Sequence, residues 1–147
     1  MTLAHILDHK GHDVVTARAG MSLKEIADIL SAHNIGAVVV LTEADRVCGI
    51  VSERDIVRHL SVGGAVSLED PVWCRMTSDV VFGDPSDTID AALEKMNTGR
   101  FRHLPIVRGD VLIGLVSIGD VVSHKIAAGE QNTSDLIRYI TNESYAA

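Results

Sequence analysis

The chain has 147 residues, 46% of them apolar, enough for one domain or a tightly packed pair of half-domains. Its 13 basic and 20 acidic residues give a formal charge of -7, so we do not expect nucleic acid as a partner. Two cysteines without a C-x-x-C spacing favour a reducing compartment. No apolar run approaches the ~20 residues that span a bilayer, so we expect a soluble, cytoplasmic protein that does not bind membranes.

The N-terminal segment carries His5, His9 and His12 at a spacing that would place them along one face of a helix. Gly11 interrupts that helix, and no cysteine is near. We therefore interpret the histidines as an exposed polar face and predict no metal site.

The following residues predict a β-α-β-β-α unit. Its first helix has apolar residues at the i, i+3, i+4, i+7 spacing, and Ser22 with Glu25 forms a capping box at its start. Strands of nearly continuous apolar character follow, joined by a polar turn, and then a second helix. The expected strands are residues 14–16, 37–41 and 47–51.

An internal repeat dominates the sequence. Residues 49–55 return as residues 114–120, and both copies have the pattern G-apolar-apolar-S-x-x-D. The second copy predicts strands at 80–82, 104–107 and 111–116, with a helix from Ile89 capped by Asp87 or Thr88. Because a half-domain of about 60 residues buries little surface alone, we expect a mixed α/β (α+β) fold in which the two units pack sheet to sheet with pseudo-twofold symmetry. The expected boundaries are 12–61 and 78–128 for the units, 62–77 for the linker and 129–147 for a tail with a helix at 134–145.

The S-x-x-D motif has two interpretations. Ser52 and Ser117 are suitable helix N-caps, with Asp55 and Asp120 as the acidic partners of capping boxes. A strand end that meets a helix start is also an anion site, and a carboxylate there would accept two hydrogen bonds from a ribose cis-diol. The recurrence of the motif in both units favours a nucleoside site.

A basic cluster lies at residues 100–103, where Arg100, Arg102 and His103 precede a strand. It is either a solvated strand end or a phosphate site with guanidinium and imidazole donors for charge-assisted bonds. The equivalent residues 34–37 of the first unit contain no cation, so we expect two clefts that differ in phosphate affinity. The chain has neither a nucleophile elbow nor a P-loop, and nothing predicts an enzyme.

The repeat, its two G-apolar-apolar-S-x-x-D elements and the strand F-R-H-L-P-I-V together resemble a tandem pair of cystathionine-β-synthase-type (CBS) domains over about residues 12–128. The resemblance implies clefts between the units that bind adenosine compounds, and a homodimer. It assigns ribose binding to Asp55 and Asp120, with Ser52 and Ser117 beside ribose or phosphate.

The family's sites are interdigitated, so each cleft would draw on both units. The Asp55 cleft would use Arg54, Val81, Phe82, Arg102 and His103, together with Leu104 and Pro105 of the strand that follows. The Asp120 cleft would use Thr16, Ala17, Ala37 and Val38. Gly36 and Ala37 stand at the phosphate-contacting positions of the Asp120 cleft, which argues against a phosphorylated ligand there.

These features predict a non-enzymatic regulatory sensor for signal transduction, without a catalytic cofactor. Its ligand would be an adenine nucleotide, AMP first and ADP, ATP or NAD as alternatives, and it would act on an unknown regulated protein or through its own dimer. The alternative is a scaffold with vestigial nucleotide sites that acts through its dimer.

Overall fold

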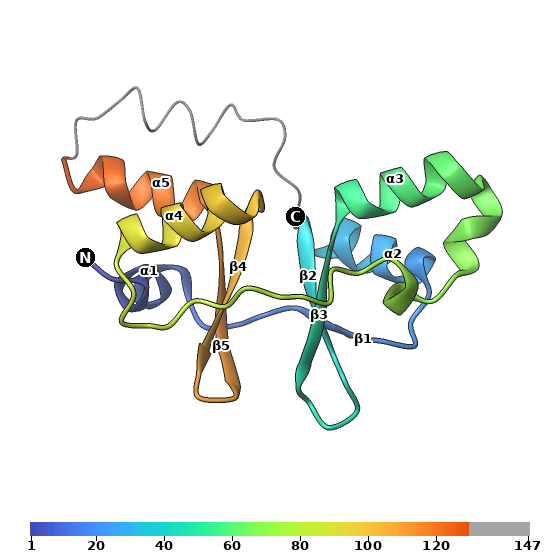
Figure 1. The fold of residues 1–147 in the computed structure, drawn as a ribbon, viewed down its shortest axis with the longest axis horizontal. Coiled ribbons are helices and arrows are strands. Elements are labelled where there is room, and N and C mark those ends of the chain that lie inside the picture. Colours follow the sequence, from blue (N-terminus) through green and yellow to red (C-terminus); the bar gives the residue numbers. More distant parts are fainter. Residues whose placement is uncertain (130–147) are drawn as a thin grey trace. The chain divides into compact units, whose positions relative to one another are not determined.

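The two repeats form two spatial units, and each is described by itself. The computed structural model describes residues 1–129, so the helix expected at 134–145 lies outside the described residues. Residues 15–80 form one unit, here called the central unit. Residues 1–14 and 81–129 form the other, here called the terminal unit. The mixed α/β fold expected from the sequence is confirmed, with helices and a small sheet in each unit (Figure 1).

The central unit has the β-α-β-β-α order that the sequence predicts. Its sheet has the order β1-β2-β3, with β1 parallel to β2 and β2 antiparallel to β3. Helix α2 begins after Ser22, whose side chain accepts a hydrogen bond from the Glu25 amide, as expected. The elements are β1 (Thr16–Arg18), α2 (Leu23–His33), β2 (Ala37–Leu41), β3 (Val47–Ser52), α3 (Glu53–Gly63) and the 3-10 turns η1 (Ala65–Glu69) and η2 (Val72–Cys74).

The terminal unit repeats this order without its first strand. A strand was predicted at 80–82, and that prediction is wrong: Gly83 instead makes an isolated parallel bridge with Ile106. Gly83 donates to the Pro105 carbonyl, and Val107 donates to the Gly83 carbonyl. Extending this ladder toward Val81 would require an N–H from Pro105, which proline lacks. The elements are α1 (Leu3–Lys10), α4 (Ile89–Gly99), β4 (His103–Arg108), β5 (Val111–Ser117) and α5 (Ile118–Ala127).

Helix α1 belongs to the unit that the second repeat forms, although it comes first in the chain. Leu3, Ile6 and Leu7 are buried in one apolar core with residues of α4, α5 and the β4–β5 ribbon. Figure 1 shows this helix, in dark blue, beside the yellow and orange elements of the terminal unit. The central unit has its own core, which α2, β2 and the buried Val72 of η2 share. The first 14 residues of the chain therefore belong to the unit of the second repeat, and the first repeat follows them in sequence.

The glycine that opens each G-apolar-apolar-S-x-x-D element allows a close approach of other parts of the chain. A Cβ on Gly49 would lie 2.4 Å from the Met76 sulfur, and a Cβ on Gly114 would lie 2.4 Å from Leu7 Cδ2. Leu7 is fully buried, so it has little room to move away. The glycines of the repeat therefore serve packing, whereas the serine that follows ends the strand and the aspartate lies in the first turn of the helix.

Candidate functional site

Each S-x-x-D element is a capping box at the point where a strand becomes a helix. At the start of α3, the Ser52 amide donates to Asp55 Oδ2 at 2.9 Å, and the Asp55 amide donates to Ser52 Oγ at 3.3 Å. The Ser52 hydroxyl also donates to Asp55 Oδ2 at 3.1 Å. Asp55 is 8% exposed, which is little for a carboxylate. The capping interpretation is confirmed, and it fixes the carboxylate at a helix N-terminus.

The second motif has the same capping box and one further partner. The Ser117 amide donates to Asp120 Oδ2 at 2.8 Å. Lys10 Nζ, from the end of α1, lies 2.5 Å from the same oxygen and 2.8 Å from the Leu115 carbonyl oxygen. Partial burial works to raise the pKa of Asp120, but the bonds from Lys10 and Ser117 outweigh it and hold that pKa below its usual value. Asp120 is therefore ion-paired with Lys10, whereas the Asp55 carboxylate accepts its hydrogen bonds from Ser52 at the start of its own helix.

The strand beside each motif places equivalent residues next to the serine. In the central unit Ala37 pairs with Ser52, and the Glu53 amide donates to the Gly36 carbonyl at 2.9 Å. In the terminal unit His103 pairs with Ser117, and the Ile118 amide donates to the Arg102 carbonyl at 2.8 Å. The structure thus confirms that Arg102 and His103 stand where the other repeat has Gly36 and Ala37.

His103 is a neutral imidazole at neutral pH. Burial, followed by the positive charge of Lys10, lowers the pKa of His103 to about 4, against a smaller opposing effect of Asp120. Its Nδ1 is buried and has no hydrogen-bond partner within residues 1–129. Without a ligand this imidazole is therefore uncharged at pH 7, and its charge-assisted bond to phosphate stays a prediction. The adjacent Arg102, just before β4, carries a permanent positive charge.

The remaining residues predicted to contact a ligand differ in exposure. Val81 is 42% exposed, whereas Leu104 is fully buried in the core of the terminal unit. Only the backbone of a residue so buried is suited to meet a ligand. Phe82, Thr16 and Arg54 are half-buried, and Pro105, Ala17, Ala37 and Val38 are buried.

The structure groups the predicted site residues by unit. In the terminal unit, Arg102 and His103 lie at the start of β4, beside Ser117 at the end of β5 and near Asp120 in the first turn of α5. The central unit holds Ala37 and Val38 on the strand paired with the end of β3, where Ser52 and Asp55 lie. The pairing of Asp55 with Arg102 and His103 in one cleft, and of Asp120 with Thr16 and Ala37 in another, stays a prediction.

Lys10 is the residue that sequence reasoning missed. It is 110 positions from Asp120, and no local pattern links the two. A basic residue in the last turn of a helix is ordinarily explained by the helix dipole alone. Only the packing of α1 against the second repeat places its ammonium on the motif.

The N-terminal histidines make local or backbone contacts. His5 Nδ1 lies 3.1 Å from the Thr2 amide nitrogen, His9 Nδ1 lies 3.2 Å from the His5 carbonyl oxygen, and His12 Nδ1 lies 3.0 Å from the Ile113 carbonyl oxygen. Helix α1 ends at Gly11, as the sequence predicts. None of the helices described over residues 1–129 is long and apolar enough to cross a membrane.

The chain matches the CBS domain family over residues 7–62 and 68–126. It is 44% identical in sequence to a CBS-domain containing protein from Agrobacterium tumefaciens whose crystal structure is known. The two structures align with a TM-score of 0.82, over 84% of this chain and 92% of the other. It is also 33% identical to the mitochondrial CBS domain-containing protein CBSX3 of Arabidopsis thaliana, over 76% of this chain and 56% of the relative.

The CBS domain pair of protein MJ0100 was solved in complex with 5′-methylthioadenosine and S-adenosyl-L-methionine. It is 23% identical to this chain, and the two structures align with a TM-score of 0.76 over 89% of this chain and 98% of the other. At that identity the likeness shows the fold alone. The chain spans 33%, 56% and 65% of the lengths of the first three curated relatives that it matches. Two matches to one domain family in tandem cover most of the sequence. This chain therefore belongs to the CBS domain family, as a pair of CBS domains.

Proposed function

We propose that this chain is a non-enzymatic regulatory module that binds an adenine nucleotide, with AMP as the first candidate and ADP, ATP or NAD as alternatives. The observation that carries the proposal is Asp55, whose nearly buried carboxylate accepts two hydrogen bonds from Ser52 at the start of α3. The capping contacts use Oδ2, and the ribose hydroxyls would donate to Oδ1. A preordered acceptor of this kind loses little conformational entropy when a ligand binds.

The Asp55 site is the better candidate of the two for ribose. Asp120 Oδ2 already accepts a bond from the Lys10 ammonium, so a ribose hydroxyl there would compete with an ion pair. Asp55 has no such competitor in the described part of the chain, since its contacts come from Ser52. The proposed cleft joins Asp55 with Arg102 as the phosphate-binding cation, in the interdigitated arrangement that the family resemblance implies.

The nature of the ligand is supported by a neighbour with the same fold. The CBS domain pair of MJ0100 was solved with two adenosine compounds, S-adenosyl-L-methionine and 5′-methylthioadenosine. Both carry an adenine base and a ribose ring, the groups that Val81, Phe82 and Asp55 of this chain would contact. A ligand would regulate a partner protein, or a homodimer of this chain, by binding one conformation of the pair more tightly than another.

Calorimetric titration tests this function. The purified chain is titrated separately with AMP, ATP, NAD and S-adenosyl-L-methionine, and with GMP as a control for the base. We expect saturable heat with at least one adenosine compound and weaker or no binding of GMP. Absence of heat and of any thermal shift with all four adenosine compounds would overturn the proposal.

A second function, a scaffold with vestigial nucleotide sites, is favoured by exposed apolar side chains on the central unit. They include Val57, Val62, Val66 and Trp73, each at least 60% exposed. A scaffold would bind its partner equally well with and without nucleotide, whereas a sensor would not. Pull-downs from lysate in the presence and absence of AMP separate the two functions.

A further inference from the structure

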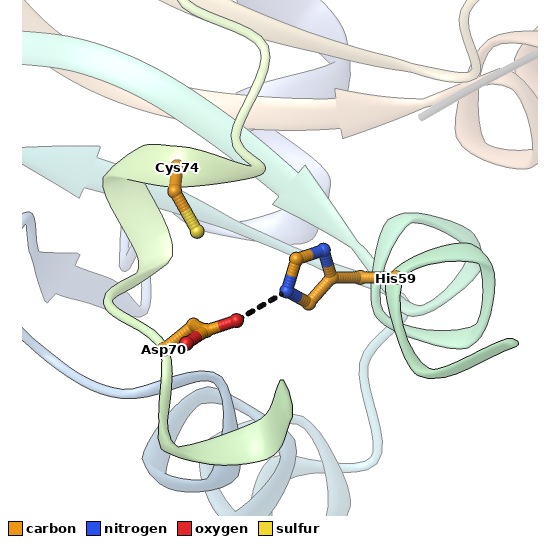
Figure 2. A group of neighbouring side chains, drawn as sticks. All are labelled: His59, Asp70 and Cys74. Atoms are coloured by element: carbon orange, nitrogen blue, oxygen red, sulfur yellow. Dashed lines mark hydrogen bonds and ion pairs between the residues drawn. The ribbon is translucent and has the colours of Figure 1, made fainter. Parts of the chain in front are cut away.

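Three side chains of different chemistry converge in the central unit, away from the S-x-x-D motifs. His59 lies on α3, Asp70 follows η1, and Cys74 ends η2. Their ligand atoms all lie within 4.8 Å of one another, and His59 Nε2 is 2.8 Å from Asp70 Oδ2. Figure 2 shows the three side chains pointing toward a common centre, His59 from its helix and Asp70 and Cys74 from one continuous segment opposite it. No other group of three such residues is found within residues 1–129.

The backbone that carries these residues is firmly anchored. The Asp70 amide donates to the Ser67 carbonyl, and the Asp70 carbonyl accepts from the Leu23 amide at 2.9 Å. The Cys74 amide donates to the Pro71 carbonyl at 3.1 Å, and Val72 between them is fully buried in the core. His59 lies on α3, which is fixed at its start by the Ser52 capping box. A fixed backbone holds potential ligands in place before an ion binds.

We propose that His59 Nε2, Asp70 Oδ2 and Cys74 Sγ bind a divalent transition-metal ion of the zinc class. A hydrogen bond between His59 and Asp70 explains two of the three residues, but not a thiol directed at the same point. Imidazole, carboxylate and thiolate are all zinc ligands, and the thiolate selects against magnesium and calcium. In a tetrahedral site, ligand atoms lie about 3.4 Å apart, so the ion would replace the His59–Asp70 hydrogen bond after small side-chain rotations.

The surface position of the cluster is suited to metal entry. The side chains of His59 and Asp70 are 22% and 48% exposed, and Cys74 is exposed. Three protein ligands leave a fourth position for water or a ligand from solution. A bound ion would link α3 to the Asp70–Cys74 segment, in addition to the hydrogen bonds already present.

The cluster is not a by-product of the repeat. In the second repeat His124 is the counterpart of His59, and its Nδ1 lies 3.0 Å from the Asp120 carbonyl oxygen of its own helix. Sequence reasoning missed the site because the three residues lack the short, regular spacing of familiar zinc motifs and follow one another at intervals of 11 and 4 positions. The proposal is also independent of nucleotide binding, since it uses none of the residues of the proposed cleft.

Cobalt substitution tests the site on the full chain, reduced and freed of metal. Titration with Co²⁺ is expected to produce a thiolate-to-cobalt charge-transfer band in the near ultraviolet that saturates at one equivalent and disappears when Zn²⁺ is added. The exposed Trp73, the only tryptophan of the chain, adjoins Cys74, so bound Co²⁺ should also quench its fluorescence. The band reports sulfur ligation, which the N-terminal histidines do not provide.

Matched variants decide the assignment. Cys74→Ser should abolish the band, and Cys48→Ser should leave it unchanged, because Cys48 donates to the Val40 carbonyl elsewhere in the unit. His59→Gln and Asp70→Asn should each weaken Zn²⁺ affinity by about 100-fold or more, measured by competition with a chromophoric chelator. The proposal is overturned if the native chain gives no band, if Cys74→Ser keeps it, or if His59→Gln and Asp70→Asn both bind Zn²⁺ like the native chain.

Discussion

Replacing Asp55 with alanine should weaken the binding of the adenosine ligand by about ten- to a hundredfold. The proposed ribose bonds go to a carboxylate, and the loss of a charged hydrogen-bond partner costs ~1.5–3 kcal/mol. The Asp55 carboxylate is nearly buried and held by Ser52, so a neighbouring side chain would not readily replace it. Dissociation constants from calorimetric titration of the native and variant chains measure the effect.

Asp120→Ala is the matched control, because it removes a capping box of the same geometry from the second repeat. Both variants lose the helix-capping contacts, which typically stabilise a protein by about 1 kcal/mol. Urea denaturation shows whether each variant remains folded at the titration temperature. If Asp120→Ala abolishes binding while Asp55→Ala leaves the affinity unchanged, the choice of cleft is wrong.

The free energy of unfolding should fall by an amount on the order of 3 kcal/mol between about pH 6.5 and pH 4, on account of His103 alone. Burial lowers the pKa of His103 to about 4 in the folded chain, from 6.5 in an unperturbed histidine. Between these values the unfolded chain takes up a proton that the folded chain does not, so acid favours unfolding. This contribution is complete above pH 6.5 and is lost as the pH falls through the range. Urea denaturation at a series of pH values measures it.

Two variants isolate the histidine. His103→Gln should remove this part of the pH dependence, because glutamine does not titrate. Lys10→Met should raise the pKa of His103 toward its ordinary value, since the ammonium of Lys10 is one of the causes of the shift. The imidazole resonances of His103 in NMR spectra follow the pKa directly. A midpoint for His103 near pH 6.5 in the native chain would contradict the account.

Local patterns in the sequence were enough to predict most of the fold. The caps at Ser22, Ser52, Thr88 and Ser117 all form, because a capping contact spans only three residues and depends on local backbone geometry. The strands of β2 to β5 lie within a residue or two of their expected ranges. The strand expected at 80–82 fails because its pairing depends on Pro105, a partner distant in sequence.

The candidate site was predictable only in part. The repeat identified Asp55 and Asp120, since duplicated motifs mark equivalent positions, and the density of basic residues identified Arg102 and His103. The contact of Lys10 with Asp120 and its effect on the pKa of His103 follow from how α1 packs, which no spacing in the sequence specifies. The His59, Asp70 and Cys74 cluster likewise depends on α3 and the Asp70–Cys74 segment, which meet only in the folded chain.

A crystal structure of the chain grown with AMP would show the proposed ribose and phosphate contacts directly. We expect both ribose hydroxyls to lie within hydrogen-bond distance of the Asp55 carboxylate and the phosphate to lie against the Arg102 guanidinium. A structure in which AMP at saturating concentration leaves Asp55 without a ligand, or binds through its ribose to Asp120 alone, would contradict this expectation.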